Sequence, residues 1–248
     1  MISRPLFLSA LLAASTIFAA PALAQSIPAY VTAAVSDPGR PDADKSRDAD
    51  RKPAESVAFA GVKQGDQVLE LLGSGGYYTR ILAKTVGPRG HVYTTVPEAM
   101  MANRPTAADG LKALATDYPN TSVLVQPDGS PSAPVPLDVV WTSLNYHDLH
   151  NPGPFGAGDL AGFNKAVFAA LKPGGTFLVI DHASAPGSGV TQTGKLHRID
   201  PETVKSEVQA AGFTFAGSSD ILKRADDDYT TRSNDKDTQF IFRFTKPR

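Results

Sequence analysis

The chain of 248 residues contains no cysteine, so no disulfide bond stabilises it and its stability must come from the hydrophobic core. It also lacks an excess of one charge, because 24 Lys and Arg residues stand against 25 Asp and Glu residues, without a basic stripe. This balance argues against binding of nucleic acid or of an anionic membrane through bulk charge. With 42% hydrophobic residues the chain can bury a substantial core, and its length suits one large domain.

The longest apolar run lies at the N-terminus. Arg4 supplies a positive charge, residues 6–20 form an apolar stretch too short to span a bilayer comfortably, and residues 22–24 (ALA) fit an A-x-A cleavage site. We interpret residues 1–24 as a Sec-type signal peptide with cleavage after Ala24, because no Arg-Arg pair indicates twin-arginine export. The mature protein is expected to be periplasmic or secreted, with no membrane segment after signal cleavage.

Residues 25–52 are rich in Pro, Asp, Arg and Ala and form an N-terminal arm. Residues 27–35 fit a short helix, and the charged, turn-rich stretch 36–51 fits a surface loop. We expect the arm either to clasp a second subunit or to cover the cleft of its own chain, and the sequence leaves the oligomeric state open. The main domain is expected to span residues 53–248, beginning with a helix at Pro53.

From Pro53 onwards, strand patterns alternate with helix patterns. Strands are expected at 67–72, 91–96, 122–126, 138–143, 176–181, 213–218 and 239–245, and helices at 77–85, 106–117, 158–171 and 201–211. This alternation predicts an α/β fold, a doubly wound and mostly parallel sheet of seven strands with helices on both faces. No helix-length apolar pattern separates the last two strands, so the last strand should be antiparallel. The acidic run 226–228 between them fits a solvated loop.

The stretch QVLELLGSGGYYTR at residues 67–80 is the most informative. An apolar strand pattern carries one acid, Glu70, breaks into a glycine turn and resumes as a helical pattern. The glycine turn consists of Gly73, Ser74, Gly75 and Gly76. Glycines allow a backbone to approach a ligand closely, and a helix N-terminus presents free N–H groups. A strand, a glycine turn and a helix in this order are typical of a nucleotide-like ligand site in an α/β sheet.

Histidines and carboxylates gather at the ends of two later strands. The fourth strand continues into Asn145, Tyr146, His147, Asp148, Leu149 and His150, the fifth continues into Asp181 and His182, and His197 lies in the following loop. The carboxyl ends of parallel strands border the ligand crevice of an open α/β sheet. We therefore expect these side chains and the glycine turn to face one hollow.

Two chemistries fit this group. In the first, His147 or His182 acts as a general base, since imidazole has a suitable pKa near neutral pH. Asp148 or Asp181 would orient the ring, and Tyr146 would shape the substrate wall. In the second, imidazoles and a carboxylate bind zinc or a related transition metal ion. The ligands would then be His147, His150, Asp181 and His182. Purely structural histidines are the third interpretation.

The order of elements, together with the phrases GGYYTRILA, LNYHDLH, LKPGGTFLVIDH and LHRIDPETV, resembles the class I S-adenosylmethionine-dependent methyltransferases. The resemblance spans about residues 53–246 and points to an exported, poorly characterised bacterial branch. It implies methyl transfer from S-adenosylmethionine to an unidentified small-molecule acceptor. It also implies that Glu70 receives the ammonium group of the cofactor and that the glycine turn wraps its methionine part.

The chain departs from the family pattern in its cofactor motif. The glycine positions of the family's G-x-G-x-G fall on Leu72, Ser74 and Gly76. In addition, a chain that is exported unfolded cannot carry a cofactor with it, and S-adenosylmethionine is made in the cytoplasm. A binding module that keeps the fold but has lost methyl transfer is therefore an alternative, as is a metal-dependent activity in the same cleft.

Other cofactor contacts are carried over from the resemblance position by position. The family's ribose-binding acid at the end of the second strand falls on Val96 here, and the nearest acid is Glu98. Asp128 stands where the family often places an adenine contact. Asn145 is also expected to contact the cofactor. A nicotinamide-binding G-x-G-x-x-G motif fits less well, because Tyr78 occupies its third glycine position.

Overall fold

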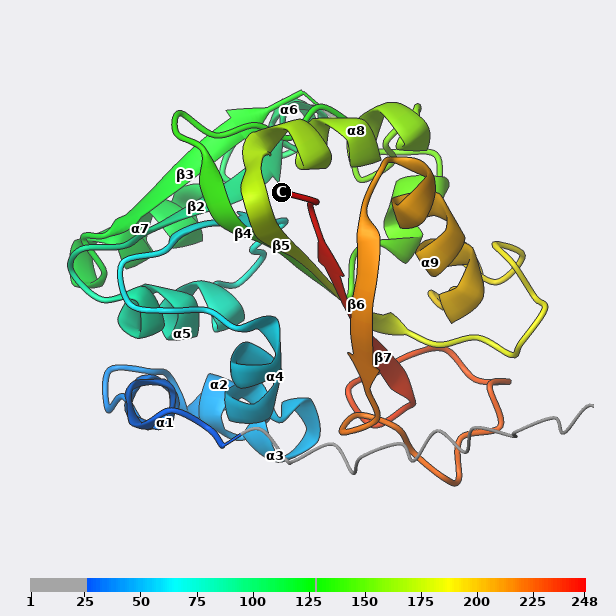
Figure 1. Ribbon diagram of the computed structural model, residues 1–248, viewed down its shortest axis with the longest axis horizontal. Helices are drawn as coiled ribbons and strands as arrows, with labels where there is room; N and C mark the ends of the chain where they lie inside the picture. Colours follow the sequence, from blue (N-terminus) through cyan, green and yellow to red (C-terminus); the bar gives the residue numbers. More distant parts are fainter. Residues whose placement is uncertain (1–25, 128) are drawn as a thin grey trace, which may run out of the picture.

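The computed structural model describes residues 26–127 and 129–248. The predicted signal peptide and Asp128 lie outside these residues. Seven strands form one mixed sheet in the order β3-β2-β1-β4-β5-β7-β6 (Figure 1). The strands are β1 (Gln67–Leu71), β2 (His91–Pro97), β3 (Thr121–Gln126), β4 (Leu137–Ser143), β5 (Leu171–His182), β6 (Thr214–Ser219) and β7 (Gln239–Thr245).

The direction of each strand follows from its connection. Strands β1 to β5 pair in parallel. Helices lie in the connections from β1 to β2, β2 to β3 and β4 to β5, whereas no helix of the described residues lies between β3 and β4. Strand β7 inserts between β5 and β6 and is antiparallel to both. The predicted fold class is therefore confirmed, including the antiparallel last strand.

Helices cover both faces of the sheet. They are α1 (Ala29–Val35), α2 (Asp42–Lys45), α3 (Asp48–Arg51), α4 (Pro53–Ala60), α5 (Tyr77–Val86), α6 (Glu98–Asn103), α7 (Asp109–Asp117), the 3-10 helix η1 (His147–His150), α8 (Leu160–Ala170) and α9 (Pro201–Ala210). Helices α1, α4 and α5 lie on one face and α8 and α9 on the other (Figure 1). Alternate residues of a strand point to opposite faces of the sheet. Trp141 therefore packs in the core between the sheet and α1, α4 and α5, and Val140 packs in the core between the sheet and α8 and α9. None of the helices in the described part of the chain is long and apolar enough to cross a bilayer.

The N-terminal arm packs against its own chain. Val31 is fully buried against α5, and the Tyr30 hydroxyl donates a hydrogen bond to the carbonyl oxygen of Val62 at 3.0 Å. The stretch 36–51, predicted to be a surface loop, instead contains α2 and α3. Its order comes from ion pairs, since Arg40 binds Asp48 at 2.7 Å. The arm therefore packs against its own chain, and clasping of a second subunit stays a prediction of the sequence.

Candidate functional site

The glycine turn closes tightly over the carboxylate of Glu70. This side chain is 4% exposed and accepts a hydrogen bond from the Thr79 hydroxyl. A Cβ atom on Gly73 would lie 2.0 Å from Thr94 Oγ1 and 3.0 Å from Glu70 Oε2. Only glycine fits there, so the turn and the acid form one compact unit.

The backbone of the turn keeps the conformation that glycines would provide. Leu72, Ser74 and Gly76 have φ angles of 57°, 49° and 80°, and these are the three glycine positions of the family motif. A left-handed conformation costs a residue with a side chain about 1–2 kcal/mol. Gly75, which lies between these positions, has no positive φ, and a Cβ on it would meet open space. The substituted motif therefore retains the geometry of the turn at a cost in stability.

Two adjoining cavities flank this turn at the carboxyl ends of β1 and β4. The polar cavity, of about 270 Å³, is lined by Asp44, Arg47, Arg51, Glu70, Leu71, Leu72, Gly73, Ser74, Gly75, Tyr77, Tyr78, Ser143, Leu144 and Asn145. The apolar cavity, of about 40 Å³, is lined by Leu71, Leu72, Thr95, Val96, Pro97, Gln126, Pro127, Gly129, Pro131, Thr142, Asn145, Leu149, Phe155 and Phe163. Leu71, Leu72 and Asn145 line both, so the two cavities share a wall.

The polar cavity presents opposite charges. Burial raises the pKa of Glu70 to about 7, although the hydrogen bond from Thr79 opposes this shift. From the N-terminal arm, Arg47 Nε and Arg51 Nη2 bind the carboxylate of Asp235 at 2.6 and 2.9 Å. Two carboxyl groups, of Glu70 and Asp44, and two guanidinium groups therefore border the same cavity, which suits the ammonium and carboxylate groups of an amino acid. Sequence reasoning missed both arginines, and the only signal was the high charge of the arm.

The other predicted cofactor residues take different places. Asn145 lines both cavities, and its Nδ2 donates to the carbonyl oxygen of Leu71 at 3.3 Å. Glu98 begins α6 and is exposed, directly after Pro97 in the wall of the apolar cavity. Among the described residues, the neighbours of Asp128 in the sequence, Pro127 and Gly129, line that cavity.

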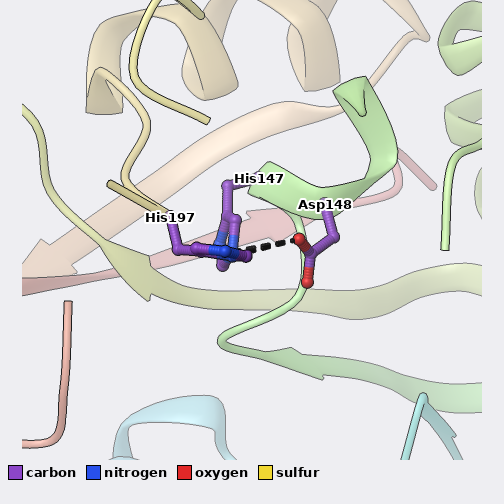
Figure 2. A group of neighbouring side chains, drawn as sticks. All are labelled: His147, Asp148 and His197. Carbon is purple, nitrogen blue, oxygen red and sulfur yellow. Dashed lines mark hydrogen bonds and ion pairs between the residues drawn. The ribbon is translucent and has the colours of Figure 1, made fainter. Parts of the chain in front are cut away.

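His147, His150, His182 and His197 lie apart from these cavities and line neither of them. His147 is 2% exposed, and its Nδ1 lies 2.8 Å from Oδ1 of the fully buried Asp181. Its Nε2 faces His197 Nδ1 at 3.2 Å and Asp148 Oδ1 at 3.3 Å (Figure 2). The expected common hollow of the glycine turn and the imidazoles is therefore not observed among the described residues.

The charge of His147 bears on its predicted role as a base. Burial alone would lower the pKa of His147, but the carboxylates of Asp181 and Asp148 outweigh it and raise the pKa to about 10. An imidazole that already carries a proton at neutral pH cannot accept another. This charge state argues against His147 as the general base.

The remaining predicted ligands and catalytic groups have other partners. His182 Nδ1 lies 2.7 Å from Asp237 Oδ1, and His150 Nε2 lies 3.3 Å from Glu207 Oε2. The predicted metal ligands His147, His150, Asp181 and His182 therefore do not converge on one point. Among the described residues, the group with suitable metal-binding geometry is instead His147, Asp148 and His197.

Tyr146 lies in the core rather than in a substrate wall. It is fully buried, accepts a hydrogen bond from Asn164 Nδ2 at 2.8 Å and donates one to Glu207 Oε2 at 3.2 Å. These partners belong to α8 and α9, on the face opposite α5. The side chain therefore ties η1 to two helices and does not line either cavity.

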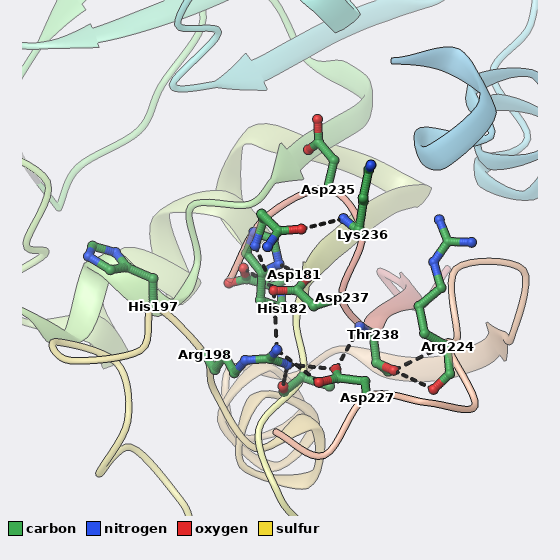
Figure 3. Close-up of polar contacts among 12 residues, drawn as sticks. Asp181, His182, His197, Arg198, Arg224, Asp227, Asp235, Lys236, Asp237 and Thr238 are labelled. Atoms are coloured by element: carbon green, nitrogen blue, oxygen red, sulfur yellow. Dashed lines mark hydrogen bonds and ion pairs between the residues drawn. The ribbon is translucent and has the colours of Figure 1, made fainter. Parts of the chain in front are cut away.

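The acidic run 226–228 is also more than a solvated loop. Asp227 binds the fully buried guanidinium of Arg198 at 2.8 Å and accepts from the backbone N–H of Thr238 (Figure 3). Arg198 also lies 3.3 Å from Asp237, the partner of His182. The loop between β6 and β7 is thus fixed by a buried ion-pair network, which a local charge pattern does not reveal.

In sequence, the chain is similar to a known methyltransferase over part of its length. No known protein-family profile matches the chain. Over 81 residues it is 43% identical to the protein-L-isoaspartate O-methyltransferase of Ignicoccus hospitalis, and this segment covers 33% of the chain and 36% of that protein. The chain therefore spans about a third of the length of this curated relative.

Solved structures give a wider match. A S-adenosylmethionine-dependent methyltransferase of Aquifex aeolicus superposes with a TM-score of 0.53 at 19% identity, covering 83% of this chain and 98% of that one. One of Clostridium acetobutylicum superposes with a TM-score of 0.53 at 10% identity, covering 89% and 98%. At such identities the similarity concerns the fold alone. The chain has the fold of the class I S-adenosylmethionine-dependent methyltransferases.

Proposed function

We propose that this protein transfers the methyl group of S-adenosylmethionine to a small-molecule acceptor. The observation that carries the proposal is the polar cavity, where Glu70 and the two arginines of the arm surround the glycine turn of a methyltransferase fold. The amino-acid end of the cofactor bears an ammonium and a carboxylate group. Glu70 would bind the ammonium, and Arg47 or Arg51 would bind the carboxylate.

The rest of the cofactor would extend into the apolar cavity. Adenine would lie among Val96, Pro127 and Phe163, with Asp128 as its polar partner and Glu98 as the ribose contact. At about 40 Å³ this cavity must widen to admit a ring, and we expect Phe155, which is 37% exposed, to move outwards. The bound sulfonium supplies the methyl group, and Asn145, at the junction of the cavities, would border it.

Histidine assistance remains a prediction of the sequence. His182, which is 6% exposed and whose Nδ1 lies 2.7 Å from Asp237 Oδ1, is the candidate base at the carboxyl end of β5. If it removes a proton from the acceptor, the His182→Gln variant will bind the cofactor normally but lose methyl transfer. Equal turnover by this variant and the natural protein would remove histidine assistance from the proposal.

Calorimetry with S-adenosylmethionine and the chain from residue 25 tests the proposal directly. Glu70→Gln should weaken binding by about 10-fold or more, because a charged hydrogen bond to the ammonium group becomes a neutral one. Glu202→Gln is the matched control, since this carboxylate lies on α9 with a side chain that is 74% exposed. Absence of binding by the natural protein at millimolar cofactor would overturn the proposal.

A second candidate is an exported binding module with the same cavity and no methyl transfer. It is favoured by Leu72 and Ser74, which hold left-handed backbone where the family has glycine. Calorimetric binding of the cofactor without release of S-adenosylhomocysteine in the presence of candidate acceptors would support it. Export itself is tested by N-terminal sequencing of the protein recovered from the periplasmic fraction. The proposed cleavage after Ala24 predicts Gln25 as its first residue.

A further inference from the structure

A candidate ligand site lies outside both cavities, in the cluster of His147, Asp148 and His197. His147 Nε2, Asp148 Oδ1 and His197 Nδ1 all lie within 4.8 Å of one another (Figure 2). The two imidazole nitrogens are 3.2 Å apart, and Asp148 Oδ1 lies 3.3 Å from one and 3.4 Å from the other. Three potential donor atoms therefore surround one small volume.

The orientation of His147 suits a metal ligand. Asp181 accepts only, so the proton between them must sit on His147 Nδ1 at 2.8 Å. Nε2 is then the atom that faces the cluster, and its own proton must leave when a metal ion binds. A carboxylate that holds the distal N–H of a histidine is the usual partner of a metal-bound imidazole. Asp181 is itself fixed, because it also accepts from the backbone N–H groups of His147 and His182.

The position of His197 is enforced by the loop that carries it. Its backbone has a φ of 53°, which is uncommon for a residue with a side chain. The next residue, Arg198, is fully buried and binds the carbonyl oxygen of Ala183 and the carboxylate of Asp227. Figure 3 shows Arg198 directed into this network and His197 directed away from it. The anchored loop thus presents the imidazole to His147 and Asp148.

We propose that His147, Asp148 and His197 bind one divalent transition metal ion of the zinc class. Two imidazoles and one carboxylate are a ligand set for zinc or non-haem iron. Asp148 and Asp181 together supply two negative charges that offset those of the ion. The His197 side chain is 31% exposed, so water can reach the cluster. This proposal is independent of cofactor binding.

One neighbouring group opposes the metal. Arg232 Nη2 lies 3.0 Å from His197 Nε2, and a guanidinium can only donate. Nε2 must then accept, which places the proton of a neutral His197 on Nδ1, the atom that would bind the ion. Arg232 is exposed and can move away. Its removal should therefore strengthen metal binding, a result that a purely structural histidine cluster does not predict.

Cobalt serves as the probe, because its visible absorption reports coordination. The tag-free chain from residue 25 is stripped with a chelator and titrated with Co²⁺. We expect the natural protein to bind one ion per chain. His197→Asn should bind Co²⁺ at least about 100-fold more weakly, since loss of a ligand should exceed the 10–100-fold cost of an outer-shell change. Arg232→Ala should bind Co²⁺ more tightly than the natural protein. Asparagine tolerates a positive φ, so the loop is retained.

His150→Gln is the control, because its imidazole pairs with Glu207 outside the cluster. It should bind Co²⁺ as the natural protein does. Circular dichroism and the melting temperature establish that each variant is folded. Three outcomes would overturn the proposal: no binding at millimolar Co²⁺, an equal loss in His150→Gln and His197→Asn, or unchanged binding in His197→Asn.

Discussion

Replacement of Glu70 by glutamine should change how stability depends on pH. In the folded protein, burial raises the pKa of Glu70 from 4.5 to about 7. Between these values the folded state keeps a proton that the unfolded state has lost. Stability therefore falls as pH rises from 4.5 to 7 and is level above it. At 1.36 kcal/mol per pKa unit, the contribution of this group falls by about 3 kcal/mol over that range.

Urea unfolding at pH 5, 6, 7 and 8 measures this contribution. The Glu70→Gln variant has no titrating group at this position. Relative to the natural protein, its free energy of unfolding should therefore increase by up to about 3 kcal/mol from pH 5 to pH 8. Glu202→Gln, which changes an exposed carboxylate, should follow the natural protein at every pH. Parallel profiles for the natural protein and Glu70→Gln would refute the burial argument.

The same titration links to ligand binding. The ammonium group of S-adenosylmethionine favours the ionised form of Glu70, so binding below pH 7 should release a proton. Calorimetry in two buffers with different ionisation enthalpies detects that release. Affinity should rise with pH up to about 7 and then level off, whereas Glu70→Gln should show neither effect.

Three further changes follow from the geometry. Ser74→Gly relieves a φ of 49° and should stabilise the protein by about 0.5–1 kcal/mol in urea unfolding, after the entropy of the added glycine is subtracted. Gly76→Ala should instead destabilise it, because the new Cβ would lie 2.5 Å from Leu114 Cδ1 at a φ of 80°. Arg51→Met should weaken S-adenosylmethionine binding about 10–100-fold in calorimetry, the equivalent of a charge-assisted hydrogen bond, whereas the exposed Arg89→Met should not.

Much of the fold was predictable because its signals are local. The strand predicted at 239–245 has the observed bounds, and the missing helix before it indicated its antiparallel direction. The arm was not predictable in the same way. Its order depends on pairs such as Arg51 with Asp235, which are 184 positions apart in the sequence. No pattern along 36–51 encodes a partner at that distance.

The candidate site, like the fold, was predictable only where its signal in the sequence is local. The end-of-strand rule placed Asn145 and the histidines at one edge of the sheet, and Asn145 does line the cavities. The side to which the following residues turn depends on the backbone. Leu144 has a φ of 61°, and beyond that bend Tyr146 and His147 are buried away from the cavities. Such a bend at leucine has no signature in the sequence.

The glycine turn shows why its motif could change without loss of shape. Its backbone is held by contacts from outside the turn: Thr95 Oγ1 accepts from the N–H of Leu72 at 2.9 Å, and Asn145 donates to the carbonyl oxygen of Leu71. When neighbours determine a conformation, a strained residue can persist there. Glycine remains obligatory only where a side chain would collide, as at Gly73. The spacing of glycines is therefore a weaker marker of this candidate site than the buried acid and the bend that encloses it.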